Sequence, residues 1–437
     1  MVTVPTRLLI IAFVALMCGS PLFTQAEVAQ QHGPVNVIYG KVDFRSGLDH
    51  FYAKLYQLQK GVPGKVVIVH IGDSHVQADH FPGVLRRLLQ QRFGNGGRGL
   101  VFPYRVIGTN GPPDYSSESN VKWVYRRNVK SLPPIPIGLS GITMQTESHD
   151  AEISLKILPY KDMRYSFTKL VLFHDKSDAA YDVEVFCKRS SEVDMVDSSN
   201  NTRVSSIVPG QKYTPDHSLF MSTFIFPELQ TEVSIRAKKT NTLQSFFQMY
   251  GLLLEEDTNG IIYNTIGVNG AEFRHFNNSD YFQEQLKALQ PDLIIVSLGT
   301  NDGYVRNFDM NEFYFQAQTF VKTLQASNVA ASILLTTPPG VKIRNRRDLK
   351  AQNVLLARNA ILNLYRPNGV ACWDLYGVLK KYRRILTNQK PSADKVHFRK
   401  AEYEVQGELL YNVLMDGYKN YISGQRISTT DPKTGNK

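Results

Sequence analysis

Two stretches of the chain alternate short apolar runs with segments whose apolar residues recur at helical spacing. In the first stretch, the run Val66–Val69 predicts a buried strand, and Phe81–Phe93 carries the apolar spacing of a helix. The second stretch repeats this alternation from Ile261 onward and ends in a helix predicted over about 400–421. Strands that alternate with helices of this length predict a parallel sheet covered by helices on both faces.

The second stretch contributes most of the predicted α/β elements. Its strands are expected at Ile261–Ile266, Leu293–Leu298 and Ala331–Thr337, and its helices at Tyr281–Leu289, Met310–Ser327 and Leu349–Tyr365. Asp348 is expected to cap the last of these helices, because an Asp side chain accepts hydrogen bonds from the first backbone N–H groups of a helix.

Between these stretches, over residues 115–255, the pattern changes to short β-rich runs separated by polar turns. The runs are Glu152–Leu158, Lys169–Phe173, Tyr181–Phe186, Phe220–Phe226 and Glu232–Ala237. This pattern predicts an antiparallel β-sandwich inserted into the α/β domain. The α/β domain would then consist of residues 27–114 and 256–424, and the polar residues 425–437 are expected to form a disordered tail.

The first 26 residues have the composition of a secretory signal peptide. Their one charged side chain is Arg7, and the apolar stretch Leu8–Met17 is too short to cross a bilayer about 30 Å thick. The mature chain is expected to begin near Glu27, in a secreted or periplasmic protein without a transmembrane segment. A lipoprotein acylated at Cys18 is the less favoured alternative, because Met17 is a poor residue before such a cleavage site.

Charge and cysteine content exclude several classes of partner. The formal net charge of +11 favours association with anionic cell-envelope polymers or lipid headgroups. Nucleic acid is not an expected partner, because Lys and Arg are scattered apart from short runs at 342–347 and 380–384. Cys187 and Cys372 lie far apart and outside any Cys-x-x-Cys pair, so they are expected to be small buried hydrophobic residues.

A candidate nucleophile follows the first predicted strand, in Gly72-Asp73-Ser74-His75. A turn after a buried parallel strand brings the next side chain to the carboxyl edge of the sheet, where α/β folds bind their ligands. Ser74 occupies this position. The alternative is that Ser74 only caps the following helix, as Ser often does.

A candidate base and carboxylate stand just before the last predicted helix, in Asp394-Lys395-Val396-His397. A Ser hydroxyl needs a base to take its proton, and that base needs a carboxylate to orient it. His397 and Asp394 would supply these roles for Ser74. The alternative is a helix-capping Asp with an incidental His. A working triad predicts Ser74 Oγ within ~3.2 Å of a His397 nitrogen.

Acyl transfer also needs hydrogen-bond donors for the oxyanion of the tetrahedral intermediate. The candidates are the backbone N–H groups of Ser74 and Gly270 and the side-chain amide of Asn301. Gly270 and Asn301 each follow a predicted parallel strand, so both are expected at the same sheet edge as Ser74. The alternatives are that Gly270 is an ordinary turn glycine and Asn301 a turn or cap residue, but their shared placement after successive strands favours the functional role.

Four segments together resemble, in chain order, the signature blocks of SGNH (GDSL-type) hydrolases. They are Gly72-Asp73-Ser74, Gly270, Gly299-Thr300-Asn301-Asp302 and Asp394-x-x-His397, and the resemblance covers roughly residues 30–110 and 256–424. It implies a flavodoxin-like three-layer α/β/α sandwich. It also implies that Ser74 is the nucleophile, that Ser74, Gly270 and Asn301 form the oxyanion hole, and that His397 and Asp394 complete the triad.

Position 75 is His where the common form of the family has Leu. Gly-Asp-Ser-His followed by Val76-Gln77-Ala78-Asp79 resembles the branch that contains peptidoglycan O-acetyl esterases. Some of those esterases carry a β-sandwich resembling a carbohydrate-binding module between the first two blocks, where residues 115–255 lie here. The resemblance implies removal of acetyl groups from glycan hydroxyls, with peptidoglycan as one candidate glycan.

No cofactor is expected. His75, Asp79 and His80 could be imagined as metal ligands, but they lack the spacing of a metal motif, so no metal is expected either. His75 is instead expected to be a packing or pocket-wall residue.

The leading hypothesis is a secreted serine esterase that acts on an acylated glycan or small ester through an acyl-enzyme on Ser74. An O-acetyltransferase with the same triad and a non-catalytic glycan-binding protein are the alternatives. The first two differ only in whether water or a sugar hydroxyl accepts the acyl group, and the sequence does not separate them.

Overall fold

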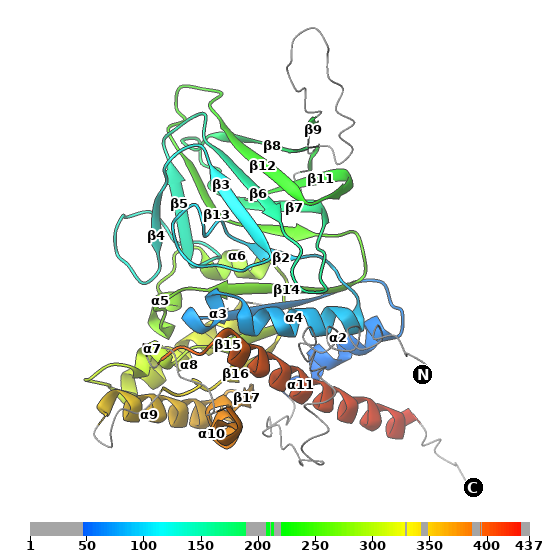
Figure 1. Cartoon of the computed structure of the whole chain (residues 1–437), viewed down its shortest axis with the longest axis vertical. Helices are drawn as coiled ribbons and strands as arrows, with labels where there is room; N and C mark the ends of the chain where they lie inside the picture. Colours follow the sequence, from blue (N-terminus) through cyan, green and yellow to red (C-terminus); the bar gives the residue numbers. More distant parts are fainter. Residues whose placement is uncertain are drawn as a thin grey trace, which may run out of the picture. The chain divides into compact units, whose positions relative to one another are not determined.

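The computed structural model describes residues 47–188, 207–209, 211–213, 220–327, 330–341, 348–386, 394 and 396–429 (Figure 1). These residues all belong to one unit of the chain, Tyr39–Lys437. The predicted signal peptide and residues 430–437 of the predicted tail lie outside the described residues.

Five parallel strands form the sheet that carries the candidate site. In spatial order they are β14 (Gly260–Gly267), β1 (Lys65–Gly72), β15 (Leu293–Ser297), β16 (Ser332–Thr336) and β17 (Ala371–Trp373). Numbered along the chain, this order is 2-1-3-4-5, the order of flavodoxin-like doubly wound sheets. The strand order reverses between β1 and β15, and folds of this kind bind their ligands beyond the carboxyl ends of the strands at that point.

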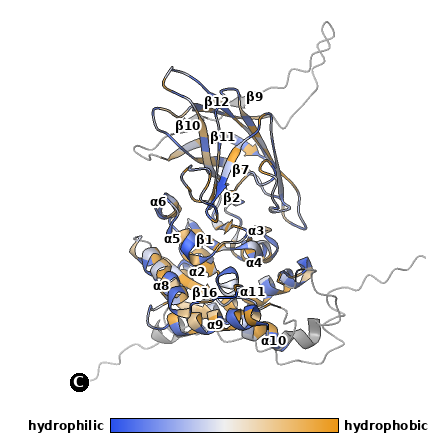
Figure 2. Cartoon of the chain, turned by 90° about the vertical axis from the view of Figure 1, so that its left-hand side faces the viewer, coloured by the Kyte–Doolittle hydropathy of each residue, from blue (hydrophilic) through white to orange (hydrophobic). Residues whose placement is uncertain are grey.

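Helices cover both faces of this sheet, because successive side chains of a strand point to opposite faces. In β15, Ile295 joins a hydrophobic cluster with one set of helices, whereas Ile294 and Val296 join a second cluster with another set. The first set is α2 (Asp49–Gln59), α4 (His80–Phe93), α10 (Leu375–Leu386) and α11 (Lys400–Thr429). The second set is α5 (Phe273–Asn277), α6 (Phe282–Ala288), α8 (Met310–Ala326) and α9 (Leu349–Leu364). Figure 2 shows hydrophobic and hydrophilic residues on both α8 and α9, as expected of helices with one buried face.

Two antiparallel sheets occupy the segment 115–255. One contains β10 (Gln211–Tyr213), β11 (Met221–Gln230), β7 (Phe167–His174), β13 (Phe247–Glu255), β5 (Ile142–Thr146) and β4 (Val124–Arg127), with β2 (Gly99–Val101) paired to β13. The other contains β3 (Tyr115–Ser119), β6 (Glu152–Ile157), β12 (Glu232–Lys238), β8 (Asp182–Lys188) and β9 (Ile207–Pro209). Strand β6 has the alternating burial that its sequence predicts, with Ile153, Leu155 and Ile157 buried. Buried residues of both sheets belong to the same hydrophobic cluster as Ile294 and Val296 of β15, so this core continues into the α/β part.

The strands and helices predicted for the two α/β stretches are confirmed. Asp348 caps α9 as predicted, since its carboxylate accepts a hydrogen bond from the backbone N–H of Ala351 at 3.4 Å. Helix α11 continues to Thr429, so the prediction that the tail begins at residue 425 is wrong for residues 425–429. Among the described helices, none is long and apolar enough to cross a membrane.

Several elements are absent from the prediction. Strand β13 is buried along its whole length, and Gln248 and Gly251 interrupt its apolar residues, so it shows neither alternation nor a continuous apolar run. Strand β17 has three residues, and α10 follows it almost at once, which leaves little periodic signal. Strand β2 lies in a stretch that we assigned to the α/β domain, and it pairs with β13 of the antiparallel sheet. The two cysteines, Cys187 and Cys372, are free and buried, as expected of small hydrophobic residues.

Candidate active site

Ser74 lies at the carboxyl end of β1, at the start of the short helix α3 (Ser74–Gln77). The cap of α3 is Asp73, whose carboxylate accepts a hydrogen bond from the backbone N–H of His75 at 2.9 Å. The alternative in which Ser74 is the helix cap is therefore wrong. Gly72 makes the turn possible, because a Cβ atom there would lie 2.4 Å from Val76 Cγ2. The hydroxyl of Ser74 is thus left available at the sheet edge.

His397 connects Ser74 to Asp394. The distance from His397 Nε2 to Ser74 Oγ is 2.7 Å, within the predicted limit, and His397 Nδ1 lies 2.5 Å from Asp394 Oδ2. In the tautomer that a general base needs, Nδ1–H donates to Asp394 and Nε2 accepts the Ser74 hydroxyl proton. The other carboxylate oxygen of Asp394 accepts the backbone N–H of His397 at 3.0 Å, which fixes the carboxylate. The arrangement has the order that general-base activation of a Ser requires.

Gly270 lies in the turn after β14, next to the carboxyl end of β1. The turn is tied to β1 by a 3.1 Å hydrogen bond from Val268 N–H to the carbonyl of Gly72. Gly270 has a φ of +87°, a conformation that favours glycine. Within the described part of the chain, neither Gly270 N–H nor Ser74 N–H donates a hydrogen bond. Both donors are therefore available to a ligand oxygen.

Asn301 belongs to the short helix α7 (Thr300–Gly303), which follows β15. Its side-chain amide donates to Asp73 Oδ2 and to the carbonyl of Ala271, both at 3.1 Å. These acceptors neighbour Ser74 and Gly270 in the chain, so the structure brings all three predicted oxyanion donors to one place. In this ligand-free arrangement both amide protons of Asn301 are engaged, and an incoming oxyanion would share or replace one of these acceptors.

Two buried carboxyl groups lie behind the site. Burial raises the pKa of Asp73 to about 7 and the pKa of Asp302 to about 8. Asp302 accepts a hydrogen bond from the backbone N–H of Phe273 at 3.1 Å. The ionisation of both groups therefore changes close to neutral pH, although neither carboxyl contacts the Ser74 hydroxyl.

His75 is a buried packing residue, as predicted. Its ring lies 5.2 Å from the ring of His397, and its Nδ1 is 2.7 Å from the hydroxyl of Tyr403. Burial lowers the pKa of His75 to about 3, so the ring is neutral at physiological pH. The Tyr403 hydroxyl also accepts the backbone N–H of Phe398 at 3.4 Å, next to His397. Tyr403 therefore connects His75 to the segment that carries the candidate base.

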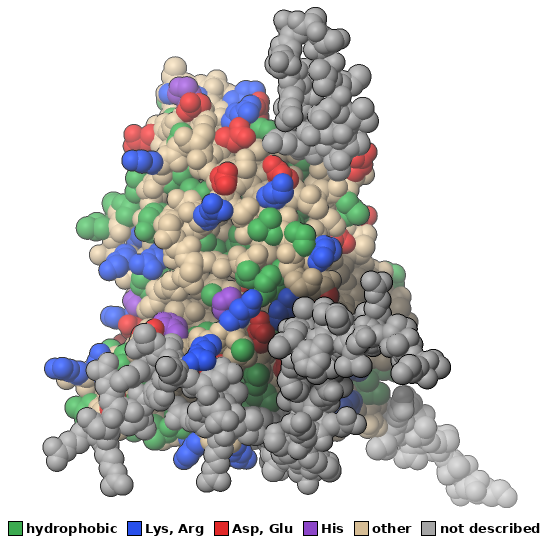
Figure 3. Space-filling model, in the orientation of Figure 1, with side chains coloured by type: hydrophobic (Ala, Val, Ile, Leu, Met, Phe, Trp, Pro, Cys, Tyr) green, Lys and Arg blue, Asp and Glu red, His purple; other side chains and the backbone are tan. Residues whose placement is uncertain are grey.

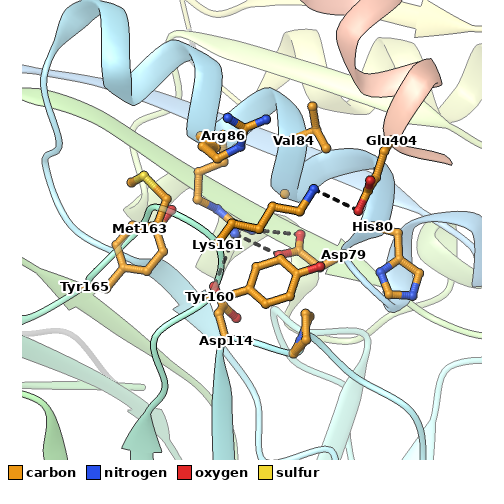
Figure 4. Close-up of a pocket in the computed structure, with 13 residues that line it drawn as sticks. Asp79, His80, Val84, Arg86, Asp114, Tyr160, Lys161, Met163, Tyr165 and Glu404 are labelled. Atoms are coloured by element: carbon orange, nitrogen blue, oxygen red, sulfur yellow. Dashed lines mark hydrogen bonds and ion pairs between the residues drawn. The ribbon is translucent and has the colours of Figure 1, made fainter. Parts of the chain in front are cut away.

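A cluster of buried charged side chains connects α4 to the parallel sheet and to an antiparallel sheet. Arg86 donates to both oxygens of Asp79 at 2.7 Å, and Thr265 of β14 donates to the same carboxylate at 3.0 Å. Arg98 lies 2.6 Å from Asp114, just before β3. Figure 4 shows the side chains of Asp79, Arg86 and Asp114 directed toward one another. The Asp79 carboxylate is therefore committed to this cluster, and the described residues contain no group of His, Cys, Asp or Glu that could hold a metal ion.

Gln77 is a further residue at the site that we did not predict. Its side chain is 1% exposed, and its amide contacts both the turn before Gly270 and the loop at 109–110. Its chemistry is not evident from the sequence, because its partners lie 32 to 192 residues away along the chain. Only the Gly-Asp-Ser-His-Val-Gln segment itself could have drawn attention to it.

Residues 238–405 match the family model of the GDSL-like lipase/acylhydrolase family. This range contains Gly270, Asn301, Asp394 and His397. No curated protein matches the chain.

Solved structures similar to this chain include a peptidoglycan O-acetylesterase, which is 20% identical. The match covers 87% of this chain and 98% of that chain with a TM-score of 0.66, so the two proteins share a fold. A lipase/acylhydrolase from Enterococcus faecalis matches 36% of this chain and 75% of its own at 20% identity, with a TM-score of 0.29. Axe2, an acetylxylan esterase from Geobacillus stearothermophilus, matches 36% and 73% at 17% identity, with a TM-score of 0.29. Residues 238–405 are therefore similar to GDSL-like acylhydrolases, and the chain shares the fold of a peptidoglycan O-acetylesterase.

Proposed function

We propose that this protein removes acyl groups, O-acetyl groups foremost, from a glycan through an acyl-enzyme on Ser74. The observation that carries the proposal is the continuous contact from Ser74 Oγ through His397 to Asp394, with distances of 2.7 and 2.5 Å. The proposed oxyanion donors, at Ser74, Gly270 and Asn301, surround the same strand ends. Nucleophile, base, orienting carboxylate and oxyanion donors are the parts that acyl transfer needs.

In the first half-reaction, Ser74 Oγ attacks the ester carbonyl carbon while His397 Nε2 takes the hydroxyl proton. Asp394 stabilises the imidazolium that forms. The negative oxygen of the tetrahedral intermediate accepts hydrogen bonds from the Ser74 and Gly270 N–H groups and the Asn301 amide. The intermediate collapses when the bond to the glycan oxygen breaks and His397 returns the proton to that oxygen. The glycan leaves with a free hydroxyl, and the acyl group remains on Ser74.

In the second half-reaction, water replaces the glycan alcohol. His397 takes a proton from the water as it attacks the acyl carbon, and the same donors hold the second oxyanion. Collapse breaks the bond to Ser74 Oγ, which regains its proton from His397, and the carboxylic acid is released. The active site is then restored without any cofactor in the steps.

The exposure of the site supports a substrate that is attached to a polymer. The side chain of His397 is 39% exposed and that of Asp394 is 52% exposed, so the triad lies at the surface rather than in a deep pocket. An acetyl group on a glycan strand can reach such a site while the strand remains outside. The net charge of +11 favours anionic glycans such as peptidoglycan, which is the substrate named for the structurally similar esterase. Figure 3 shows Lys and Arg interspersed with Asp and Glu over the face in view, so the basic side chains do not form a single binding patch there.

We further propose that residues 115–255 form a β-sandwich domain that holds the glycan, inserted between the hydrolase segments 27–114 and 256–424. This division is supported by the strand pairing, since the described strands of residues 115–255 pair in two antiparallel sheets and not with the parallel sheet. The exposed side chain of Tyr125 on β4 supplies an aromatic ring of the kind that sugars stack on. The signal peptide predicted over residues 1–26 supports a location outside the cytoplasm, where cell-wall glycans are found.

The test is release of acetate from O-acetylated peptidoglycan, from acetylated xylan and from p-nitrophenyl acetate. Wild type is compared with Ser74→Ala and with Ser423→Ala, a control on the exposed surface of α11. We expect Ser74→Ala to lower kcat at least about 10³-fold, because it removes the nucleophile, and the control to match wild type. Hydrolysis of p-nitrophenyl acetate alone would keep the mechanism and exclude both glycans. Acetyl transfer to added sugar in place of acetate release would assign a transferase, and inactivity of wild type on all substrates would refute the proposal.

A further inference from the structure

Gln77 makes a dense set of hydrogen bonds beside the site. Its Oε1 accepts the backbone N–H of Asn269 at 2.7 Å. Its Nε2 donates to the carbonyl of Asn110 at 2.7 Å, and it also lies within hydrogen-bond distance of Asn110 Oδ1 and Thr109 Oγ1. One buried amide thus connects three segments: helix α3, the turn after β14 and the loop at 109–110.

The turn that Gln77 contacts is the one that carries Gly270. A Cβ atom on Gly267 would lie 2.3 Å from the backbone N of Gln77, so the two backbones touch at the start of the turn. The hydrogen bond to Asn269 N–H then fixes the residue directly before Gly270. With Asn269 N–H fixed, the direction of the Gly270 N–H depends on the two backbone torsions of Asn269, φ and ψ.

Apart from the contact of Gln77 with Asn269, Gly270 is held by the hydrogen bond that closes its turn, from Ala271 N–H to the carbonyl of Val268 at 2.9 Å. It is exposed, and a Cβ atom built on it would meet nothing within 4 Å. A glycine in open space samples a wide range of backbone torsions, so the direction of its N–H depends on its neighbours. An oxyanion donor must point at the place where charge develops, and a misdirected donor loses much of its effect.

The loop at 109–110 supports the same turn from its outer side. Asn269 Nδ2 donates to Asn110 Oδ1 at 2.7 Å, so Asn110 contacts both Gln77 and Asn269. Asn110 is exposed and Asn269 is half-buried, whereas Gln77 is almost fully buried. Gln77 is therefore the inner member of a three-amide cluster, and the other two members face the solvent.

We propose that Gln77 is a positioning residue that directs the Gly270 N–H toward the oxyanion of the reaction. It acts through Asn269 and does not itself contact the substrate. The kinetic part of this inference rests on the proposed function. The ordering of the turn does not, and it can be measured without a substrate.

The kinetic experiment compares wild type, Gln77→Met and Gln77→Asn on p-nitrophenyl acetate. Gln77→Met keeps the length of the side chain and loses the hydrogen bonds, and Gln77→Asn keeps the amide but is too short to reach Asn269. We expect kcat to fall about 10- to 100-fold in both, below the effect of deleting a donor outright, with KM within about threefold of wild type. Gln57→Met is the matched control, because it makes the same substitution at an exposed position of α2, and we expect its kcat within about threefold of wild type.

The second measurement is amide hydrogen exchange in the peptide that spans 266–272, in the full chain. We expect faster exchange at Asn269 in Gln77→Met and Gln77→Asn, since its N–H loses its acceptor to solvent. A wild-type kcat together with unchanged exchange in both variants would overturn the inference. So would a rise in KM with unchanged kcat, because that result would assign Gln77 to substrate binding. If the wild-type chain proves to have no esterase activity that depends on Ser74, the proposed function fails and hydrogen exchange still decides whether Gln77 orders the turn.

Discussion

At the scale of single residues, Asp73 performs two structural tasks beside the nucleophile. One carboxylate oxygen caps α3 through His75 N–H at 2.9 Å, and the other accepts the Asn301 amide at 3.1 Å. Ser74 is consequently not needed as a cap, and Asn301 is held near the strand ends. The same burial that permits these contacts disfavours the ionised form of the carboxyl, which raises its pKa to about 7.

The raised pKa of Asp73 predicts how stability depends on pH. Between the unfolded pKa of about 3.9 and the folded value of about 7, the folded state binds more protons than the unfolded state. Its stabilising contribution is therefore complete below pH 4 and is lost as pH rises through 7. We expect the free energy of unfolding to fall over this window by no more than about 1.4 kcal/mol per pH unit for this group.

The measurement is urea unfolding of wild type and Asp73→Asn at several pH values between 4.5 and 7.5. Asn cannot ionise, so the free energy of unfolding of the variant should fall less steeply with rising pH than that of wild type, whatever the stability of the variant at pH 4.5. Asp302, whose pKa is raised to about 8, contributes a slope of the same sign in both proteins. Parallel curves for the two proteins would show that Asp73 does not titrate as described.

At the scale of elements, the end of each parallel strand presents one functional group. Strand β1 presents Ser74, β14 presents Gly270 through its following turn, and β15 presents Asn301. The 2-1-3 order makes these three strands neighbours, so groups from distant parts of the chain meet at one edge. His397 arrives separately, on the segment before α11, and its position depends on contacts made by that helix.

Tyr403 of α11 is one such contact, and it leads to a prediction. Tyr403→Phe removes the hydroxyl that joins His75 Nδ1 to Phe398 N–H, so His397 should be less well placed against Ser74. We expect kcat to fall about 3- to 10-fold with little change in KM, and the free energy of unfolding to fall by about 1–2 kcal/mol.

Steady-state kinetics and urea unfolding check this prediction, with Tyr411→Phe on the same helix as the control. Tyr411 is only partly buried and lies against the same hydrophobic cluster. A Tyr403→Phe variant that loses stability but keeps its kcat would assign the hydroxyl to folding alone.

At the scale of the whole molecule, the buried charge cluster connects the parallel sheet to the antiparallel sheets. Arg98 lies between Asp79, at 3.4 Å, and Asp114, at 2.6 Å, and its side chain is fully buried. Lys161, from the loop before β7, adds an ion pair to Glu404 of α11 at 2.9 Å, marked in Figure 4. The ion pair is partly exposed and contributes little, whereas a buried charge that loses its partner is strongly destabilising.

Arg98→Met should therefore destabilise the protein by about 3–5 kcal/mol, because it leaves Asp114 buried without its nearest cation. The double variant Arg98→Met/Asp114→Leu should recover part of this loss, since it removes both charges. Urea unfolding of the two variants and wild type measures the difference. Equal destabilisation in the single and double variants would indicate that packing, and not the unpaired carboxylate, is the cause.

The sequence predicts the α/β part well for a physical reason. Continuous apolar runs indicate the parallel strands, which are buried on both faces, and apolar residues at helical spacing indicate the helices, which bury one face. The prediction misses β13, whose apolar run is interrupted by Gln248 and Gly251, and β17, which has only three residues. The predicted Ser74 to His397 distance is confirmed, whereas the catalytic roles stay predictions until activity is measured.

By itself, the sequence determined the class of fold, the chemical groups available for acyl transfer and their order along the chain. These depend on local periodicity and on residue type, and both can be read from residues that are close together in the chain. The tertiary structure alone decided the contacts of Gln77, the commitment of Asp79 to Arg86 and the pairing of β2 with β13. In each case a side-chain amide, a charged group or a strand edge contacts a partner that only the folded chain brings near it. No local sequence pattern identifies that partner.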